Sequence, residues 1–205
     1  MLTQGQQVII LEEIKGNSYG ANLNMDESQK VQTQNFLSRI IRAAKLDAQL
    51  YEEVEADKTA MGQAFGVVAL SSLAAGIGTI GYFGGYSHVI GGMFWSIIGW
   101  LVWALLTYWI GAHILPEPQT QTNFGEMLRT IGFSSAPGLI RILGILPGLM
   151  EIAFFVASVW MLIAMVIAVR QALDYKSTWR AISVCSIGWL VQALVLILTI
   201  GVAAS

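Results

Sequence analysis

The sequence predicts an all-α membrane protein: a polytopic integral membrane helical bundle of about five transmembrane helices, preceded by a cytosolic amphipathic helix. Three observations lead to this prediction. Charged residues make up only 12% of the 205 residues, about half their share in soluble domains. No charged residue separates Lys58 from Glu117. The chain beyond Lys58 also holds four long apolar stretches and a fifth, weaker one, each near the roughly 20 residues that a helix needs to cross a bilayer.

The changes of composition divide the chain into three parts. Residues 1–32 are polar and interrupted by glycine, so we expect an irregular segment. Residues 33–58 form the expected cytosolic amphipathic region, and residues 59–205 form the transmembrane domain. The expected spans cover residues 61–83, 93–115, 127–146, 149–169 and 181–204.

The third of these stretches differs from the others. It contains Arg129, Arg141 and the helix breakers of residues 134–138. We expect a kinked or broken helix, or a surface helix followed by a short inserted piece.

Apolar residues recur at helical spacing between residues 36 and 51, and basic residues fall mostly on the other side. Such a helix can lie in the headgroup layer of an anionic membrane. It can equally dock on the membrane domain or on a partner. The residues expected to contact the membrane surface are Phe36, Arg39, Ile40, Arg42 and Lys45.

Lysine and arginine distribution predicts the orientation. Basic residues lie before the first span, beside the loop between the second and third spans, and between the fourth and fifth. Because cytoplasmic loops are enriched in these residues, we expect five crossings, a cytoplasmic N-terminus and an outward C-terminus in the cell (inner) membrane. Without a third crossing, Arg170, Lys176 and Arg180 would face outward.

Small residues recur four positions apart in and just after the first span, which places them in pairs on one helix face. Such faces let helices approach closely. We expect packing mainly within the bundle, with contact between copies as the alternative. The residues are Gly62, Gly66, Ala74, Gly78, Gly81 and Gly85.

Arg141 and Glu151 flank the expected turn at Pro147-Gly148 and would lie at similar depth on adjacent helices. Because ionisable groups are expensive inside a membrane, we predict an intramembrane ion pair between them. The alternative is that both side chains snorkel to the headgroups.

Catalytic and metal-binding motifs are missing from the sequence. It contains no GxSxG, HExxH or Walker A motif and has a single cysteine, Cys185. We therefore expect no enzyme activity, no metal and no cofactor. His88 and His113 lie near opposite membrane surfaces, where a structural role is commoner than ligation of a haem or chlorin. The net charge of −2 gives no reason to expect a nucleic-acid partner.

A set of distinctive motifs lies at residues 39–57, 116–120, 125–130, 136–147, 160–164 and 170–175. Together these motifs resemble bacterial members of the YIP-domain family, over about residues 33–195. The resemblance implies a five-helix membrane domain with a cytosolic N-terminus and an outward C-terminus, and it supplies no catalytic residue. Eukaryotic relatives are associated with Rab-type GTPases and vesicle traffic, a role that we do not transfer to this chain.

These observations favour a non-enzymatic scaffold, membrane-organising factor or accessory subunit of a larger membrane complex. The expected partners are the lipid bilayer and other membrane subunits or a second copy. The alternative is a transporter or channel component with a polar site near Arg141 and Glu151, because interrupted helices line transporter sites. An enzyme or cofactor protein is a third possibility. A polar cavity at Arg141 would favour transport, and a dry bundle with a large exposed apolar face would favour a subunit.

Overall fold

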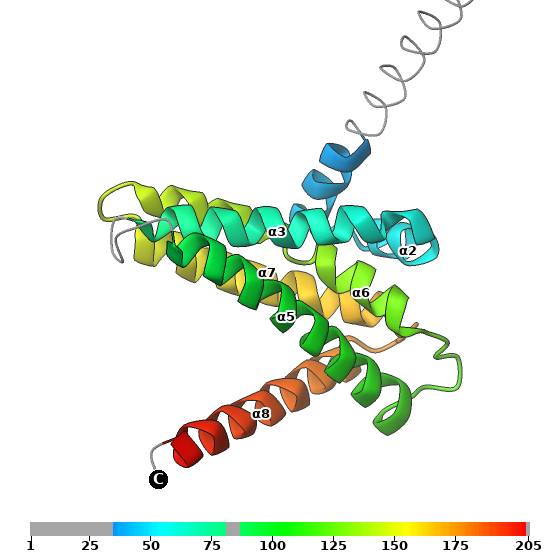
Figure 1. The fold of residues 1–205 in the computed structure, drawn as a ribbon. Helices are drawn as coiled ribbons and strands as arrows, with labels where there is room; N and C mark the ends of the chain where they lie inside the picture. The colour runs from blue at the N-terminus through cyan, green and yellow to red at the C-terminus, as the bar shows by residue number, and fades with distance from the viewer. Residues whose placement is uncertain (1–34, 81–86, 204–205) are drawn as a thin grey trace, which may run out of the picture. The chain divides into compact units, whose positions relative to one another are not determined.

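The computed structural model describes residues 35–80 and 87–203. The chain divides into two compact units, Met1–Arg39 and Ile40–Ser205, and the second contains the helical bundle. All the regular secondary structure in the described residues is helical (Figure 1). This confirms the predicted all-α class.

Three described helical segments are long and apolar enough to cross a membrane, and they coincide with the first, second and fourth expected spans. A fourth long helix coincides with the expected fifth span. The helices are α3 (Met61–Gly78, entered through the 3-10 turn η1, Lys58–Ala60), α5 (Ser87–Trp109, ending in the π-helical turn η2, Ile110–Ile114), α7 (Met150–Ala172) and α8 (Thr178–Ala203).

The weak third stretch is broken into two short helices, one of the outcomes that its sequence predicts. The first, α6 (Phe124–Phe133), begins at Asn123, whose side chain forms a reciprocal capping box with Glu126. The second, η3 (Ala136–Ile145), is a 3-10 helix with proline at its start. A 3-10 helix rises about 2.0 Å per residue and an α-helix about 1.5 Å, so the two ten-residue pieces together measure roughly 35 Å. Laid end to end, the two pieces would match a bilayer core of about 30 Å.

Three glycines spaced six residues apart hold this broken segment against α3. A Cβ atom on each glycine would lie less than 3.0 Å from an atom of α3, so only glycine permits the close approach. The facing residues on α3 are seven positions apart, and the segment therefore follows α3 from near its first turn to its last. The pairs are Gly132 with Ala64, Gly138 with Ser71, and Gly144 with Gly78.

The amphipathic helix expected over residues 36–51 is divided in two. The first helix ends at residue 44, and Leu46 adopts a positive φ of 63° at the break. The next helix, α2 (Ala48–Ala56), is capped by Asp47, whose side chain accepts a hydrogen bond from the Gln49 amide. It packs on α6 and α7 by burying Leu50, Tyr51 and Val54. Of the two uses considered for this region, α2 has the second: it is docked on the membrane domain.

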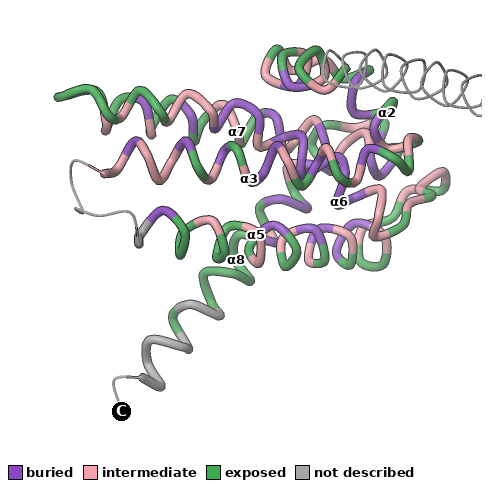
Figure 2. Tube along the Cα trace, turned by 45° about the horizontal axis from the view of Figure 1, so that its top comes forward, coloured by how far each residue is buried: buried purple, intermediate pink, exposed green. Residues whose placement is uncertain are grey.

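The burial pattern of α7 is typical of a membrane helix. Its alanines are buried, and several large apolar residues, such as Ile152 and Phe155, are exposed. Figure 2 shows buried and exposed positions alternating along α7. In lipid, small residues let helices pack closely while large apolar side chains can face the acyl chains. The buried stripe consists of Ala153, Ala157, Ala164, Ala168 and Ala172.

Candidate functional site

A cavity of about 400 Å³ lies among α3, α5, the broken third segment, α7 and α8. It is called here the polar cavity, because serines and Arg141 interrupt its mainly apolar wall. Its position is central along the spans, since the lining Ser158 is eight residues, or about 12 Å, from the first residue of α7. Tryptophan and methionine side chains supply much of the remaining wall. The serines of the lining are Ser71, Ser72, Ser96, Ser134, Ser135 and Ser158.

Arg141 on η3 is the charged residue of this cavity, and its described lining contains no carboxylate. One terminal nitrogen, Nη2, donates to Ser158 Oγ at 3.3 Å, and the guanidinium carbon lies 5.5 Å from the centre of the Phe154 ring. A neutral hydroxyl and an aromatic face therefore hold the Arg141 cation, with no carboxylate of the described residues paired to it.

The structure does not bring the expected pair together. Glu151 is exposed in the first turn of α7, and within the described residues no ion pair joins it to Arg141. The chain does turn at Pro147-Gly148, where Gly148 has a positive φ of 79°. Arg141 instead faces the second and third turns of α7, where Phe154 and Ser158 lie.

Unused hydrogen-bond donors gather around this cavity. Three buried polar side-chain atoms lack a partner in the described structure, and two of them, Arg141 Nε and Trp103 Nε1, belong to lining residues. The hydroxyls of Ser72, Ser134 and Ser158 donate to carbonyls of their own helices. Two buried donors of the cavity therefore lack an acceptor in the described structure, and an anionic group would provide one for each.

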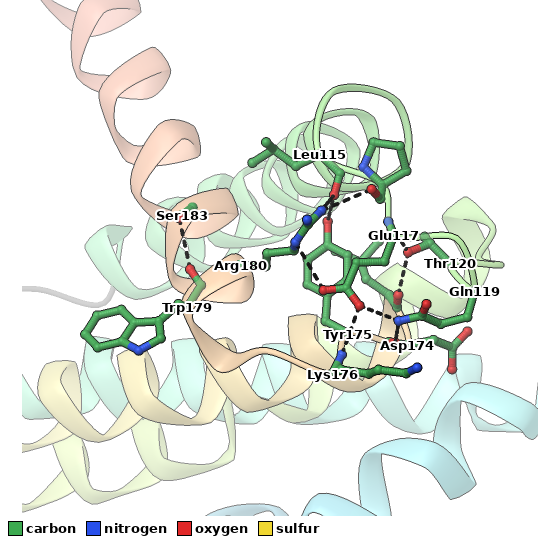
Figure 3. A network of polar contacts seen from close by, with 12 residues as sticks. Leu115, Glu117, Gln119, Thr120, Asp174, Tyr175, Lys176, Trp179, Arg180 and Ser183 are labelled. Carbon is green, nitrogen blue, oxygen red and sulfur yellow. Dashed lines mark hydrogen bonds and ion pairs between the residues drawn. The ribbon is translucent and has the colours of Figure 1, made fainter.

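A second polar cluster, called here the loop clasp, joins the loop between α5 and α6 to the loop between α7 and α8 (Figure 3). Glu117 lies at its centre, 3.1 Å from Arg180 Nε, and accepts a hydrogen bond from the Lys176 amide. The Tyr175 hydroxyl donates to the carbonyls of Leu115 at 2.7 Å and Gly111 at 3.0 Å. Burial raises the pKa of Tyr175 to about 12, so this hydroxyl remains a donor at neutral pH.

Further clasp contacts use backbone carbonyls. Gln119 Nε2 donates to the Asp174 carbonyl at 3.0 Å, and Thr120 Oγ1 donates to the Leu173 carbonyl at 2.9 Å. The two interhelical loops are thus held together by several independent bonds. Residues 116–120 and 170–175 of these loops are among the motifs that resemble the YIP-domain family. The motifs do not predict that the two loops bind each other.

Arg129 of α6 is 5% exposed and binds the end of α2. Its Nε donates to the Val54 carbonyl at 2.8 Å, and Nη2 donates to the Glu55 carbonyl. These carbonyls belong to the last turn of α2, where an α-helix leaves acceptors unpaired. Burial and the negative charges of Asp174, Glu126 and Glu52 raise the pKa of the Glu55 carboxyl to about 8, despite the opposing charge of Arg129.

The residues expected to contact the membrane surface have different environments. Ile40 is buried, whereas Lys45 is exposed. Arg42 binds Asp47 at 2.7 Å and Glu53 at 2.6 Å, so its charge is already paired. Phe36 and Arg39, in the first unit, are partly exposed.

The expected packing residues are used unevenly. Ala74 and Gly78 are buried, and Gly78 lies against the backbone of Arg141. Gly62 faces open space, and Gly66 is partly exposed. Gly81 and Gly85 lie outside the described residues. The glycines that contact α3, at positions 132, 138 and 144, were missed, although their six-residue spacing is visible in the sequence.

The long apolar helices, with buried small residues and exposed large ones, define a multi-pass helical membrane protein. The family profile of the Yip1 domain matches residues 50–200, and the chain belongs to the Yip1 domain family. No curated protein sequence and no solved structure matches the chain. The resemblance inferred from the sequence is thus confirmed at the level of the family.

Proposed function

We propose that this protein is a non-enzymatic accessory subunit or scaffold that binds another membrane protein through the second half of α8. The first half of α8 buries a regular stripe formed by Ala181, Val184, Cys185 and Gly188. Among the described residues beyond this stripe, Leu190 and Leu194 are 71% and 57% exposed. Figure 2 shows the exposed class along this part of α8.

The exposed part of α8 carries large apolar residues on much of its circumference. Successive helix positions turn by about 100°, so neighbouring exposed residues point in different directions. A helix that leaves its own bundle in this way has surface available for a helix of another subunit. The exposed residues are Trp189, Leu190, Val191, Gln192, Ala193, Leu194 and Ile197.

Co-purification tests this proposal. We expect the doubly substituted chain Leu194→Ala, Ile197→Ala to lose partner proteins that co-purify with the unaltered chain in mild detergent, as measured by quantitative mass spectrometry. The matched control is Ile152→Ala with Phe155→Ala, which trims two similarly exposed residues of α7. Equal partner recovery with both variants would contradict a role for α8.

A transporter or channel component is the second candidate. It is supported by the polar cavity beside the interrupted third segment, because discontinuous helices form substrate sites in transporters. Purified protein in liposomes should then increase the flux of a small organic anion, and Arg141→Gln should reduce that increase. Flux equal to that of protein-free liposomes would reject this candidate.

We also propose the cell (inner) membrane as the location, with a cytoplasmic N-terminus. The distribution of lysine and arginine supports this orientation. Lys45, which is exposed just after the helix that ends at residue 44, supports a role for this helix at an anionic membrane surface.

A further inference from the structure

We propose that the polar cavity binds an anionic amphiphile, with its acidic head group at Arg141 and its acyl chain in the groove between α7 and α8. This proposal gives the cavity a ligand class whether or not the ligand is transported. The groove shares Trp189, Leu190 and Ala193 with the exposed surface of α8, so the two proposals are separated at Leu194 and Ile197, which line neither the cavity nor the groove.

The positive charge of Arg141 in the cavity favours an anionic ligand. Arg141 contributes a positive charge inside the membrane domain, beside the second and third turns of α7, and the described lining offers no carboxylate to balance it. Among the described side chains, Arg141 donates a hydrogen bond to the neutral hydroxyl of Ser158, at 3.3 Å. An isolated cation in a region of low dielectric is strongly stabilised by an anion, and guanidinium binds carboxylate and phosphate oxygens especially well.

The hydrogen-bond donors without a partner in the cavity also favour an anionic ligand. Arg141 Nε and Trp103 Nε1 have no partner among the described residues. Ser96 and Ser135 line the cavity without a hydroxyl hydrogen bond to another described residue. A carboxylate or phosphate has several acceptor oxygens and no need for a donor from the protein, so it complements this wall.

The groove between α7 and α8, next to the cavity, favours a ligand with an acyl chain. It has a volume of about 940 Å³, and its wall is formed mainly by aliphatic residues of α7 and α8. Leu162 and Trp189 line both the groove and the polar cavity, so the two spaces meet at these side chains. A molecule with an acidic head and an apolar tail can occupy both. A small hydrophilic anion would leave the groove unused.

Lipid binding to the full-length chain in detergent tests the proposal directly. Native mass spectrometry would compare dioleoyl phosphatidylglycerol, dioleoyl phosphatidylcholine, oleate and inorganic phosphate. We expect phosphatidylglycerol or oleate to bind at least about tenfold more tightly than phosphatidylcholine, because only the acidic head groups compensate Arg141. The stronger of the two identifies the source as a phospholipid or a fatty acid.

Two results of this comparison would overturn the proposal. Equal affinity for phosphatidylglycerol, oleate and phosphatidylcholine would remove the role of charge. Inorganic phosphate binding as tightly as the acidic amphiphiles would remove the role of the acyl chain.

Substitutions locate the site. Arg141→Gln should weaken binding of the preferred amphiphile about tenfold or more, and Trp103→Phe should weaken it by a smaller factor. Lys176→Gln removes an exposed positive charge and Trp95→Phe removes an exposed indole N–H, so both controls should bind normally. Unchanged binding by Arg141→Gln would overturn the assignment.

A measurement on the unaltered chain covers the case in which Arg141→Gln fails to fold. Oleate and phosphatidylglycerol carrying a photoreactive group near the end of the acyl chain would be cross-linked and the adducts mapped by peptide mass spectrometry. We expect adducts concentrated in residues 162–167 and 182–193, the segments that line the groove. Adducts spread evenly over all exposed helix surfaces would contradict the proposal. Because Leu194 and Ile197 line neither space, loss of partner binding at α8 is measured separately from loss of the amphiphile.

Discussion

Arg129 shows how a charged residue can be used for structure inside this bundle. The side chain is buried, and its hydrogen bonds go to the carbonyls of Val54 and Glu55 at the end of α2. It thereby satisfies acceptors that the helix itself cannot use. The sequence identifies Arg129 only as a basic residue beside a loop, because its bonding partner is a backbone segment 74 residues away.

We expect Arg129→Met to destabilise the protein by about 2–4 kcal/mol, because two buried carbonyls lose their donor. Thermal unfolding in detergent measures the change. The control is Lys58→Met, which removes an exposed cation near the end of α2. Similar unfolding temperatures for the two variants would contradict the capping role of Arg129.

Glu55 should make the docking of α2 sensitive to pH. Its pKa is about 8 in the folded chain, well above the ordinary value of 4.5, so folding favours the protonated carboxyl. Between about pH 4.5 and 8 the folded state therefore binds more protons than the unfolded state, and stability falls as pH rises.

We expect the unfolding temperature of the unaltered chain, relative to Glu55→Gln, to decrease from pH 5 to pH 8. Glutamine keeps the neutral form throughout, which removes this part of the pH dependence. Glu151→Gln, at an exposed position of α7, should retain the original profile. Parallel profiles for the unaltered chain and Glu55→Gln would show that Glu55 does not titrate in this way.

At the scale of elements, the loop clasp and the 3-10 helix organise the bundle. The clasp fixes the loops at one end, and the 3-10 conformation of η3 lengthens the third segment enough to follow α3. Long 3-10 helices are uncommon because their hydrogen-bond geometry is poor. The ten-residue 3-10 helix η3 is longer than most, and its glycines Gly138 and Gly144 lie in close contact with α3.

Tyr175 provides a test of the clasp. We expect Tyr175→Phe to lower stability by about 1–2 kcal/mol, because the carbonyls of Gly111 and Leu115 at the π-helical turn lose a common donor. Tyr108→Phe is the matched control, since the described contacts of Tyr108 involve its ring. Thermal unfolding in detergent measures both variants, and equal losses would contradict the clasp.

The sequence predicts the long elements well and the tertiary contacts poorly. Three apolar stretches of about 20 residues correspond to α3, α5 and α7, because length and hydropathy determine a span locally. The helix break at Leu46 has no proline or glycine to signal it. The sequence also could not predict the partners of Arg141. They depend on which turns of η3 and α7 face each other, and tertiary packing determines that alignment.

At the scale of the whole membrane unit, the clasp constrains the topology. It joins the loop before α6 to the loop after α7, so both loops belong to the same end of the bundle. The chain between them therefore crosses an even number of times. Since α7 is long enough to span, we propose that α6 and η3 together make the other crossing, which gives five in total with α3, α5 and α8.

Cysteine accessibility tests this topology most directly. Cys185, the single cysteine, is first replaced by alanine, and single cysteines are then placed at exposed loop positions by Gln121→Cys, Pro147→Cys and Lys176→Cys. With a membrane-impermeant maleimide on intact cells, we predict labelling of the cysteine at position 147 and protection of those at 121 and 176 until the cells are opened. Labelling of position 176 together with protection of position 121 would place the two clasped loops on opposite sides of the membrane and would contradict the five-span account.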